Sequence, residues 1–149
     1  LMVKEPKNWI KKCEYINASR IIGQVEMMSD VSYFIKTVKD AGLEAGLAYD
    51  TETDIGDIPQ ETDIVLLLGR KSGFTPQPFC EETFEKIKKL TQIRQEKGLN
   101  FKISVDGEVN ENNIGRLKKE GGEIAYCGGA IFNGIVENNI KKIEYASQN

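Results

Sequence analysis

The sequence has no histidine among its 149 residues. It therefore lacks the side chain that most often acts as a general base near neutral pH, which is also the commonest transition-metal ligand. Cysteine is scarce as well: Cys13, Cys80 and Cys127 are far apart, odd in number and form no C-x-x-C pair. A disulfide framework or a zinc site is therefore not expected, and reduced thiols in a cytoplasm fit this composition best.

The charge balance and the apolar runs exclude further classes of protein. The sequence has 20 Lys and Arg residues and 23 Asp and Glu residues, so its net charge is −3. A basic surface that binds nucleic acid is therefore not expected. No apolar run approaches the length of a membrane span, and no charged-then-apolar leader predicts secretion. A length of 149 residues with 40% hydrophobic residues predicts one globular domain over 1–149.

Short apolar runs alternate with amphipathic helical patterns along the chain. The runs predict strands at 19–26, 43–49, 63–69, 101–107 and 123–129. The periodic segments predict helices at 7–16, 30–41, 80–97, 110–120 and 134–146. Asp30 is a suitable N-cap and Gly98 a suitable stop, while 50–62 reads as a polar loop with at most one short helical turn. The first residues, from Leu1, lie inside an apolar run, as expected of a chain that begins partway through a strand.

Strand–helix alternation predicts parallel strands with right-handed crossovers, in either a doubly wound sheet or a (β/α) barrel. A dinucleotide-binding sheet would need G-x-G-x-x-G after its first strand, and the sequence has none. Instead Gly69, Gly107, Gly128 and Gly129 stand at the ends of predicted strands, which is typical of the active face of a (β/α) barrel. Asp106 stands at the end of one strand and directly before a glycine, a position that aims a carboxylate at a small ligand.

Five segments in register resemble the ribulose-phosphate 3-epimerase family. They are "LMVKEPKNWI" (1–10), "GQVE" (23–26), "DIVLLLGRKSGFTPQPF" (63–79), "VDGEVNENNI" (105–114) and "CGGAIF" (127–132). The resemblance covers essentially the whole chain but only the last two-thirds or so of the family's barrel. It implies a single partial domain of the α/β, (β/α)8 TIM-barrel, ribulose-phosphate-binding type, lacking the first two strands and the start of the third.

The resemblance also implies a chemistry, the epimerisation of a ketopentose phosphate at carbon 3 in the pentose phosphate pathway. In the family two aspartates exchange the proton, and a divalent metal held by two histidines and both aspartates stabilises an ene-diolate. Asp106 matches one aspartate, so it is the candidate catalytic residue and metal ligand. Since only one of four ligands is matched, we expect no tightly bound metal. Gly107, Gly128, Gly129 and Gln77 are candidate phosphate contacts, with turn geometry or a solvated loop as the alternatives.

Several positions inside the chain depart from the family pattern. Gln24-x-Glu26 replaces His-x-Glu, Asp50 replaces an asparagine, Pro76 removes a backbone N–H from the phosphate loop, and Glu108 adds negative charge beside it. Two hypotheses follow. The chain is part of an epimerase whose other ligands lie upstream, or it is a non-catalytic homologue with the barrel and at most a weak phosphate site. The departures favour the second hypothesis, the non-catalytic homologue. A small sugar phosphate is the expected ligand, and a homo-oligomer is expected to cover the open sheet edges.

Overall fold

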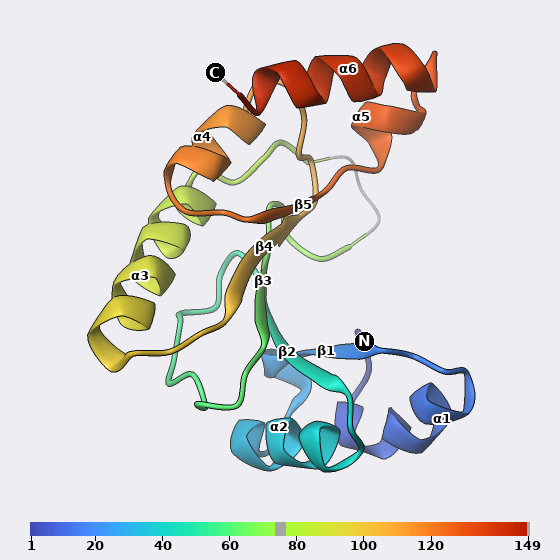
Figure 1. Cartoon of the computed structure of the whole chain (residues 1–149), viewed down its shortest axis with the longest axis vertical. Coiled ribbons are helices and arrows are strands. Elements are labelled where there is room, and N and C mark those ends of the chain that lie inside the picture. Colours follow the sequence, from blue (N-terminus) through green and yellow to red (C-terminus); the bar gives the residue numbers. More distant parts are fainter. Residues whose placement is uncertain (74–76, 149) are drawn as a thin grey trace.

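The computed structural model describes residues 1–73 and 77–148, and their centre is a five-stranded sheet in which every neighbouring pair is parallel (Figure 1). The strands are β1 (Arg20–Gln24), β2 (Glu44–Tyr49), β3 (Ile64–Leu68), β4 (Lys102–Asp106) and β5 (Ile124–Tyr126). They lie side by side in sequence order. A doubly wound sheet reverses its strand order, whereas consecutive barrel strands do not, so the barrel alternative is the correct one.

Helices connect the strands. They are η1 (Pro6–Trp9), α1 (Ile10–Tyr15), η2 (Val25–Met27), α2 (Val31–Asp40), α3 (Glu82–Lys97), α4 (Ile114–Lys119), α5 (Gly129–Phe132) and α6 (Val136–Ala146). As predicted, Asp30 caps α2, because its Oδ1 accepts a hydrogen bond of 2.9 Å from the backbone N–H of Tyr33. The predicted stop at Gly98 is confirmed by its left-handed φ of 61° at the end of α3. Across the described ranges, every helix is too short or too polar to cross a membrane.

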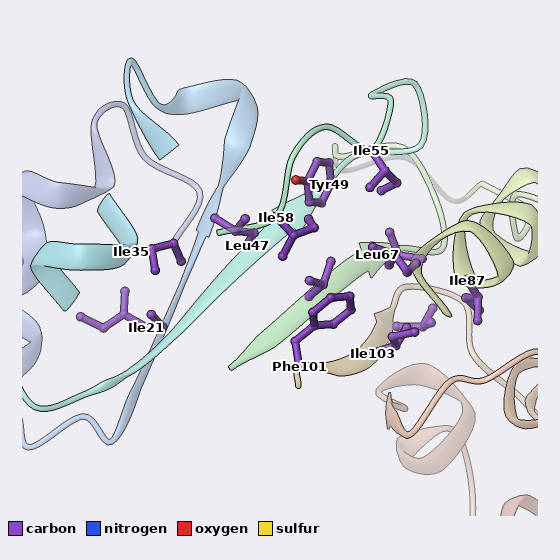
Figure 2. Close-up of a cluster of buried hydrophobic side chains, with 14 of the residues drawn as sticks. Ile21, Ile35, Leu47, Tyr49, Ile55, Ile58, Leu67, Ile87, Phe101 and Ile103 are labelled. Carbon is purple, nitrogen blue, oxygen red and sulfur yellow. The ribbon is translucent and has the colours of Figure 1, made fainter. Parts of the chain in front are cut away.

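The core lies between one face of the sheet and the helices (Figure 2). Leu47, Val65 and Ile103 stand side by side in register on β2, β3 and β4, and all three are fully buried. The helices contribute the buried residues Phe34, Ile35 and Val38 from α2 and Phe84, Ile87 and Leu90 from α3. The apolar side chains of the helices therefore pack against those of the strands in one layer. This packing holds the carboxyl ends of the strands in place.

The segment 50–62 is a loop, as predicted, but it is more than a solvated connection. Ile55 and Ile58 are only 6% and 5% exposed and close the core beyond β2. The ammonium of Lys86 on α3 donates to three carbonyl oxygens of this loop, those of Asp50 (2.7 Å), Thr51 (2.8 Å) and Thr53 (2.6 Å). The loop is thereby held against α3 by a charge-assisted cluster of hydrogen bonds.

The helix predicted at 7–16 is shorter than expected and is divided. Pro6 opens the 3₁₀ turn η1, whose residues do not follow the 3.6-residue period, so Trp9 is 38% exposed. Helix α1 ends at Tyr15, and Asn17 has a left-handed φ of 56°, which leaves Ile16 outside the helix and 71% exposed. The predicted apolar side of this helix therefore retains only its middle, Ile10 and Cys13.

Two further boundaries differ from the prediction because local hydrogen bonds compete with regular structure. The helix expected from Asn110 begins at Ile114, since the side chain of Asn110 accepts from the N–H of Asn112 at 2.9 Å and holds a turn instead. The strand expected over 123–129 keeps three residues, because Gly128, with φ −86° and ψ −80°, leaves the extended conformation.

The first residues lie where the sequence predicted a further strand, although the described residues form five strands and none at 1–3. The amino group of Leu1 donates to the carbonyl of Ile22 at 2.5 Å, and the N–H of Gln24 donates to the carbonyl of Leu1 at 3.3 Å. These two bonds place Leu1 beside β1, on the side away from β2.

Candidate functional site

The carboxyl ends of β2 to β5 meet at one edge of the sheet, where the sequence places its candidate residues. Asp50, Gly69, Asp106 and Gly128 follow or end these strands. Leu68, Asp106 and Tyr126 stand in register across β3, β4 and β5. A pocket of about 810 Å³ opens beside them. Its lining includes Arg70, Asp106, Gly107, Gly128, Gly129 and Lys142, so four of the five predicted site residues lie together.

The turn after β4 fixes the position of Asp106. The N–H of Gly69 donates to the carbonyl of Asp106 at 2.7 Å, which ties the end of β3 to the end of β4. Gly107 then has a φ of +104°, a conformation that is strained for any residue with a Cβ. The side chain of Asp106 is exposed at the pocket. The carboxylate therefore stands at a defined place on a rigid strand end, as a ligand-facing group requires.

Gly128 and Gly129 form the opposite wall. A Cβ on either residue would meet no atom within 4 Å, so both glycines border open space. The chain beyond them is held by Asn139 of α6, whose side-chain amide donates to the carbonyls of Ile131 and Asn133, both at 3.0 Å. This wall of the pocket is thus bare backbone, anchored from behind by the last helix.

Glu108 lines the pocket on the turn after Asp106. Its backbone is left-handed, with φ 55°, and its carbonyl accepts from the side-chain amides of Asn110 and Asn113, both at 3.0 Å. Its carboxylate lies 3.6 Å from the guanidinium of Arg70. The negative charge that replaces the family's glycine therefore has a cation beside it, and weaker phosphate binding because of Glu108 stays a prediction.

Three other residues that the sequence comparison singled out, the candidate Gln77 and the replacements Gln24 and Glu26, do not line the pocket. Gln77 is half-buried and is not among the lining residues, and its neighbours Thr75 and Pro76 lie outside the described residues. Gln24 is only 4% exposed, inside the sheet beside Ala48. Glu26 accepts the backbone N–H of Asp50 at 2.8 Å and thus links the ends of β1 and β2.

Asp50 is committed to structure. Its carboxylate accepts from the N–H and the hydroxyl of Thr51, at 2.7 and 3.2 Å, and from the N–H and the hydroxyl of Ser72. Burial alone would raise the pKa of Asp50, but the hydrogen bonds from Ser72 and Thr51 outweigh it, so the pKa lies below the ordinary 3.8. The residue stays ionised at neutral pH and joins the loops after β2 and β3.

Replacing Asp50 with asparagine is expected to lower the free energy of unfolding by about 1–2 kcal/mol at neutral pH, because hydrogen bonds to a charged acceptor are lost. Since the folded pKa is depressed, the stabilisation is complete above 3.8 and disappears as the pH falls through the folded value. Urea unfolding over a pH series should show the gap between the two proteins closing in acid. Asp40→Asn, which removes an exposed pair with Lys36, is the control and should cost under about 0.5 kcal/mol. A gap that stays constant into acid would contradict this account.

Arg70, Tyr126 and Lys142 line the pocket but were not predicted from the sequence. Arg70 could have been predicted, because it follows Gly69 at the carboxyl end of β3, where the other candidate residues also lie. Lys142 stands three residues after Asn139, so one face of α6 both anchors the glycine wall and presents a cation. The sequence does not reveal this role of Lys142, because it depends on α6 lying against the pocket.

The donor set here does not fit the divalent metal implied by the resemblance. Within the described ranges, no three His, Cys, Asp or Glu side chains are grouped so as to hold an ion. Cys127 lies near Asp106, but burial, and then the charge of Asp106, raise the pKa of its thiol, so it is protonated at neutral pH. Asp106 is thus the single residue that matches one of the family's metal ligands.

An all-parallel sheet in sequence order, with a pocket at the carboxyl ends of its strands, is consistent with a partial (β/α) barrel. Solved structures agree. A mutant tryptophan synthase α-subunit from Pyrococcus furiosus superimposes with a TM-score of 0.61 at 17% identity, over 96% of this chain and 60% of that one. At this identity the likeness supports the fold alone.

The sequence matches the model of the ribulose-phosphate 3 epimerase family over residues 1–132, so the chain belongs to that family. It is 29% identical over 135 residues to the ribulose-phosphate 3-epimerase of Escherichia coli (strain K12), covering 89% of this chain and 60% of the relative. The enzyme of Aquifex aeolicus (strain VF5) is 27% identical over 135 residues, with 89% and 61% covered. The chain thus spans about 60% of the length of the curated relatives it matches.

Proposed function

We propose that this chain provides the phosphate-binding part of a sugar-phosphate site and does not itself epimerise its ligand. The ligand class is a small ketose phosphate, taken from the names of the relatives. Its phosphate lies against the backbone of Gly107, Gly128 and Gly129, and Asp106 faces its hydroxyl groups. The alternative is an epimerase whose second acid–base group and metal ligands lie on residues outside this sequence.

One contrast carries the proposal. Asp106 is exposed on the pocket, whereas the carboxylates of Asp50 and Glu26 are engaged in hydrogen bonds that join neighbouring loops. Inversion of a carbon centre needs acid–base groups on two opposite faces. Glu108 and Glu111 also line the pocket, but both stand in the loop that directly follows Asp106, and Glu108 pairs with Arg70. The chain therefore keeps a binding surface while offering a proton-transfer group on one side only.

Calorimetric titration with ribulose 5-phosphate and with inorganic phosphate tests this proposal. Both are expected to bind saturably. Gly129→Leu should weaken binding by about tenfold or more, because its side chain enters open space at the pocket wall. Gly56→Leu, at a loop glycine that also has nothing within 4 Å, is the matched control and should bind as wild type does. Absence of binding, or equal binding by the Gly129 variant, would refute the proposed site.

Two expectations from the sequence stay predictions. The outer side of β5 has no neighbouring strand among residues 1–73 and 77–148, so a second copy of the chain covering that edge is proposed. A cytoplasmic location is proposed from the cysteines, since Cys13, Cys80 and Cys127 are all unpaired thiols.

A further inference from the structure

A second pocket, of about 620 Å³, lies between α4 and α6 and continues the first. The two pockets share Glu111 and Lys142 as lining residues, so they adjoin, and we call the pair the groove. Its lining includes Gly115 and Ala146, whose small side chains leave space between the helices. Apart from Glu111 and Asn112, the lining residues of the second pocket, which we call the extension, lie outside the segments that carry the family resemblance, and none of them is a proposed phosphate contact.

The extension is lined by more cations than acids. Lys119 of α4 and Lys142 of α6 line it from opposite sides, and neither ammonium has an ion-pair partner in the described part of the chain. Arg116 also lines it, with its guanidinium fixed by Glu81 at 2.7 Å and by the ring of Phe84 at 3.8 Å.

The charge therefore changes along the groove. Glu111 is the one acidic residue that lines the extension, against three cations. The first pocket is lined by three acids, Asp106, Glu108 and Glu111, and by two cations, Arg70 and Lys142. Positive potential thus rises from Asp106 toward the space between α4 and α6.

From this geometry we propose that the α4–α6 extension is a second anionic subsite, so that the groove takes a ligand with two separated anionic groups, of the sugar bisphosphate class. One phosphate lies at the glycine wall and the second between Lys119 and Lys142. The inference rests on the proposed function for the first phosphate and adds the second. Two lysine ammonium groups suit a compact dianion, because each acts as a point charge with rotatable donors.

The affinity ratio between ribulose 1,5-bisphosphate and ribulose 5-phosphate, measured by calorimetry, tests this subsite. Wild type should prefer the bisphosphate by about tenfold or more, and the preference should fall as salt is added. Lys119→Gln should reduce the ratio toward one while leaving ribulose 5-phosphate binding within about twofold. Lys141→Gln removes the same charge from α6 at a residue that lines neither pocket, and it should keep the ratio of wild type.

The outcomes separate this inference from the proposed function. If ribulose 5-phosphate binds but wild type shows no preference, or if Lys119→Gln keeps it, the second subsite is wrong and the first site stands. If ribulose 5-phosphate does not bind, the proposed function fails, and titration with pyrophosphate decides the subsite by itself. Pyrophosphate binding that Lys119→Gln removes and Lys141→Gln retains supports the subsite. Absent binding, or binding that both variants retain, overturns it.

Discussion

The purified chain is expected to leave ribulose 5-phosphate unepimerised at any enzyme-like rate, with or without added divalent metal. One proton-transfer group is in place, Asp106, and a second on the opposite face is not supplied by Asp50 or Glu26, which are held in loop contacts. General acid–base catalysis contributes about 10²–10⁴-fold, so the loss of one partner is severe. Lewis-acid stabilisation of an ene-diolate contributes several kcal/mol more, and the donor set around Asp106 does not fit a metal.

A coupled assay that follows xylulose 5-phosphate formation measures this rate, in parallel for wild type and Asp106→Asn. Both should be indistinguishable from a blank that contains metal and no protein. Ribulose 5-phosphate binding, measured on the same samples, shows that an inactive protein is folded and occupied. Turnover in wild type that disappears in Asp106→Asn would show that another group of this chain completes the proton transfer, and the non-catalytic proposal would then be abandoned.

Much of the fold was predictable because the sequence shows both short apolar strand runs and apolar residues at helical spacing. The strand runs alternate with helix faces, and Asp30 and Gly98 mark the start of α2 and the end of α3. The errors fall where short side-chain contacts decide the backbone. Asn110 forms a turn with its neighbours instead of opening a helix, and Pro6 begins a 3₁₀ turn that breaks the expected apolar side. Periodicity does not report such local competition.

The site residues also fall into those that the sequence could predict and those that it could not. Asp106, Gly107, Gly128 and Gly129 could be grouped from the sequence, because the carboxyl ends of parallel strands meet at one edge of a sheet. Lys142 could not, because its place in the pocket depends on how α6 lies against the loop after β5. The ion pair between Glu108 and Arg70 could not be predicted either, since the two residues are far apart in the sequence and meet only across β3 and β4.

Gly69→Ala is expected to have the largest effect on stability of the substitutions considered. A Cβ at this position would overlap the carbonyl oxygen of Gly107 and lie 2.7 Å from Cε2 of Phe79. The oxygen is backbone and cannot rotate away, so the end of β3 and the turn after β4 must separate. Overpacking typically costs about 1–3 kcal/mol, and a backbone clash places this variant at the upper end or above. For a chain of this size the midpoint of thermal unfolding should fall by roughly 5–10 °C.

The same substitution should also disturb the site, because the clash falls on the turn that positions Asp106. The hydrogen bond from the N–H of Gly69 to the carbonyl of Asp106, now 2.7 Å, should lengthen, and phosphate binding should weaken together with stability. Gly56→Ala is the matched control: its Cβ meets nothing within 4 Å, so it should be neutral or raise stability by up to about 1 kcal/mol through the unfolded chain. Thermal unfolding and calorimetry on both variants decide the matter. A Gly69 variant as stable as the Gly56 variant would mean that β3 and the turn after β4 are not packed as closely as described, and that Asp106 owes its position to other contacts.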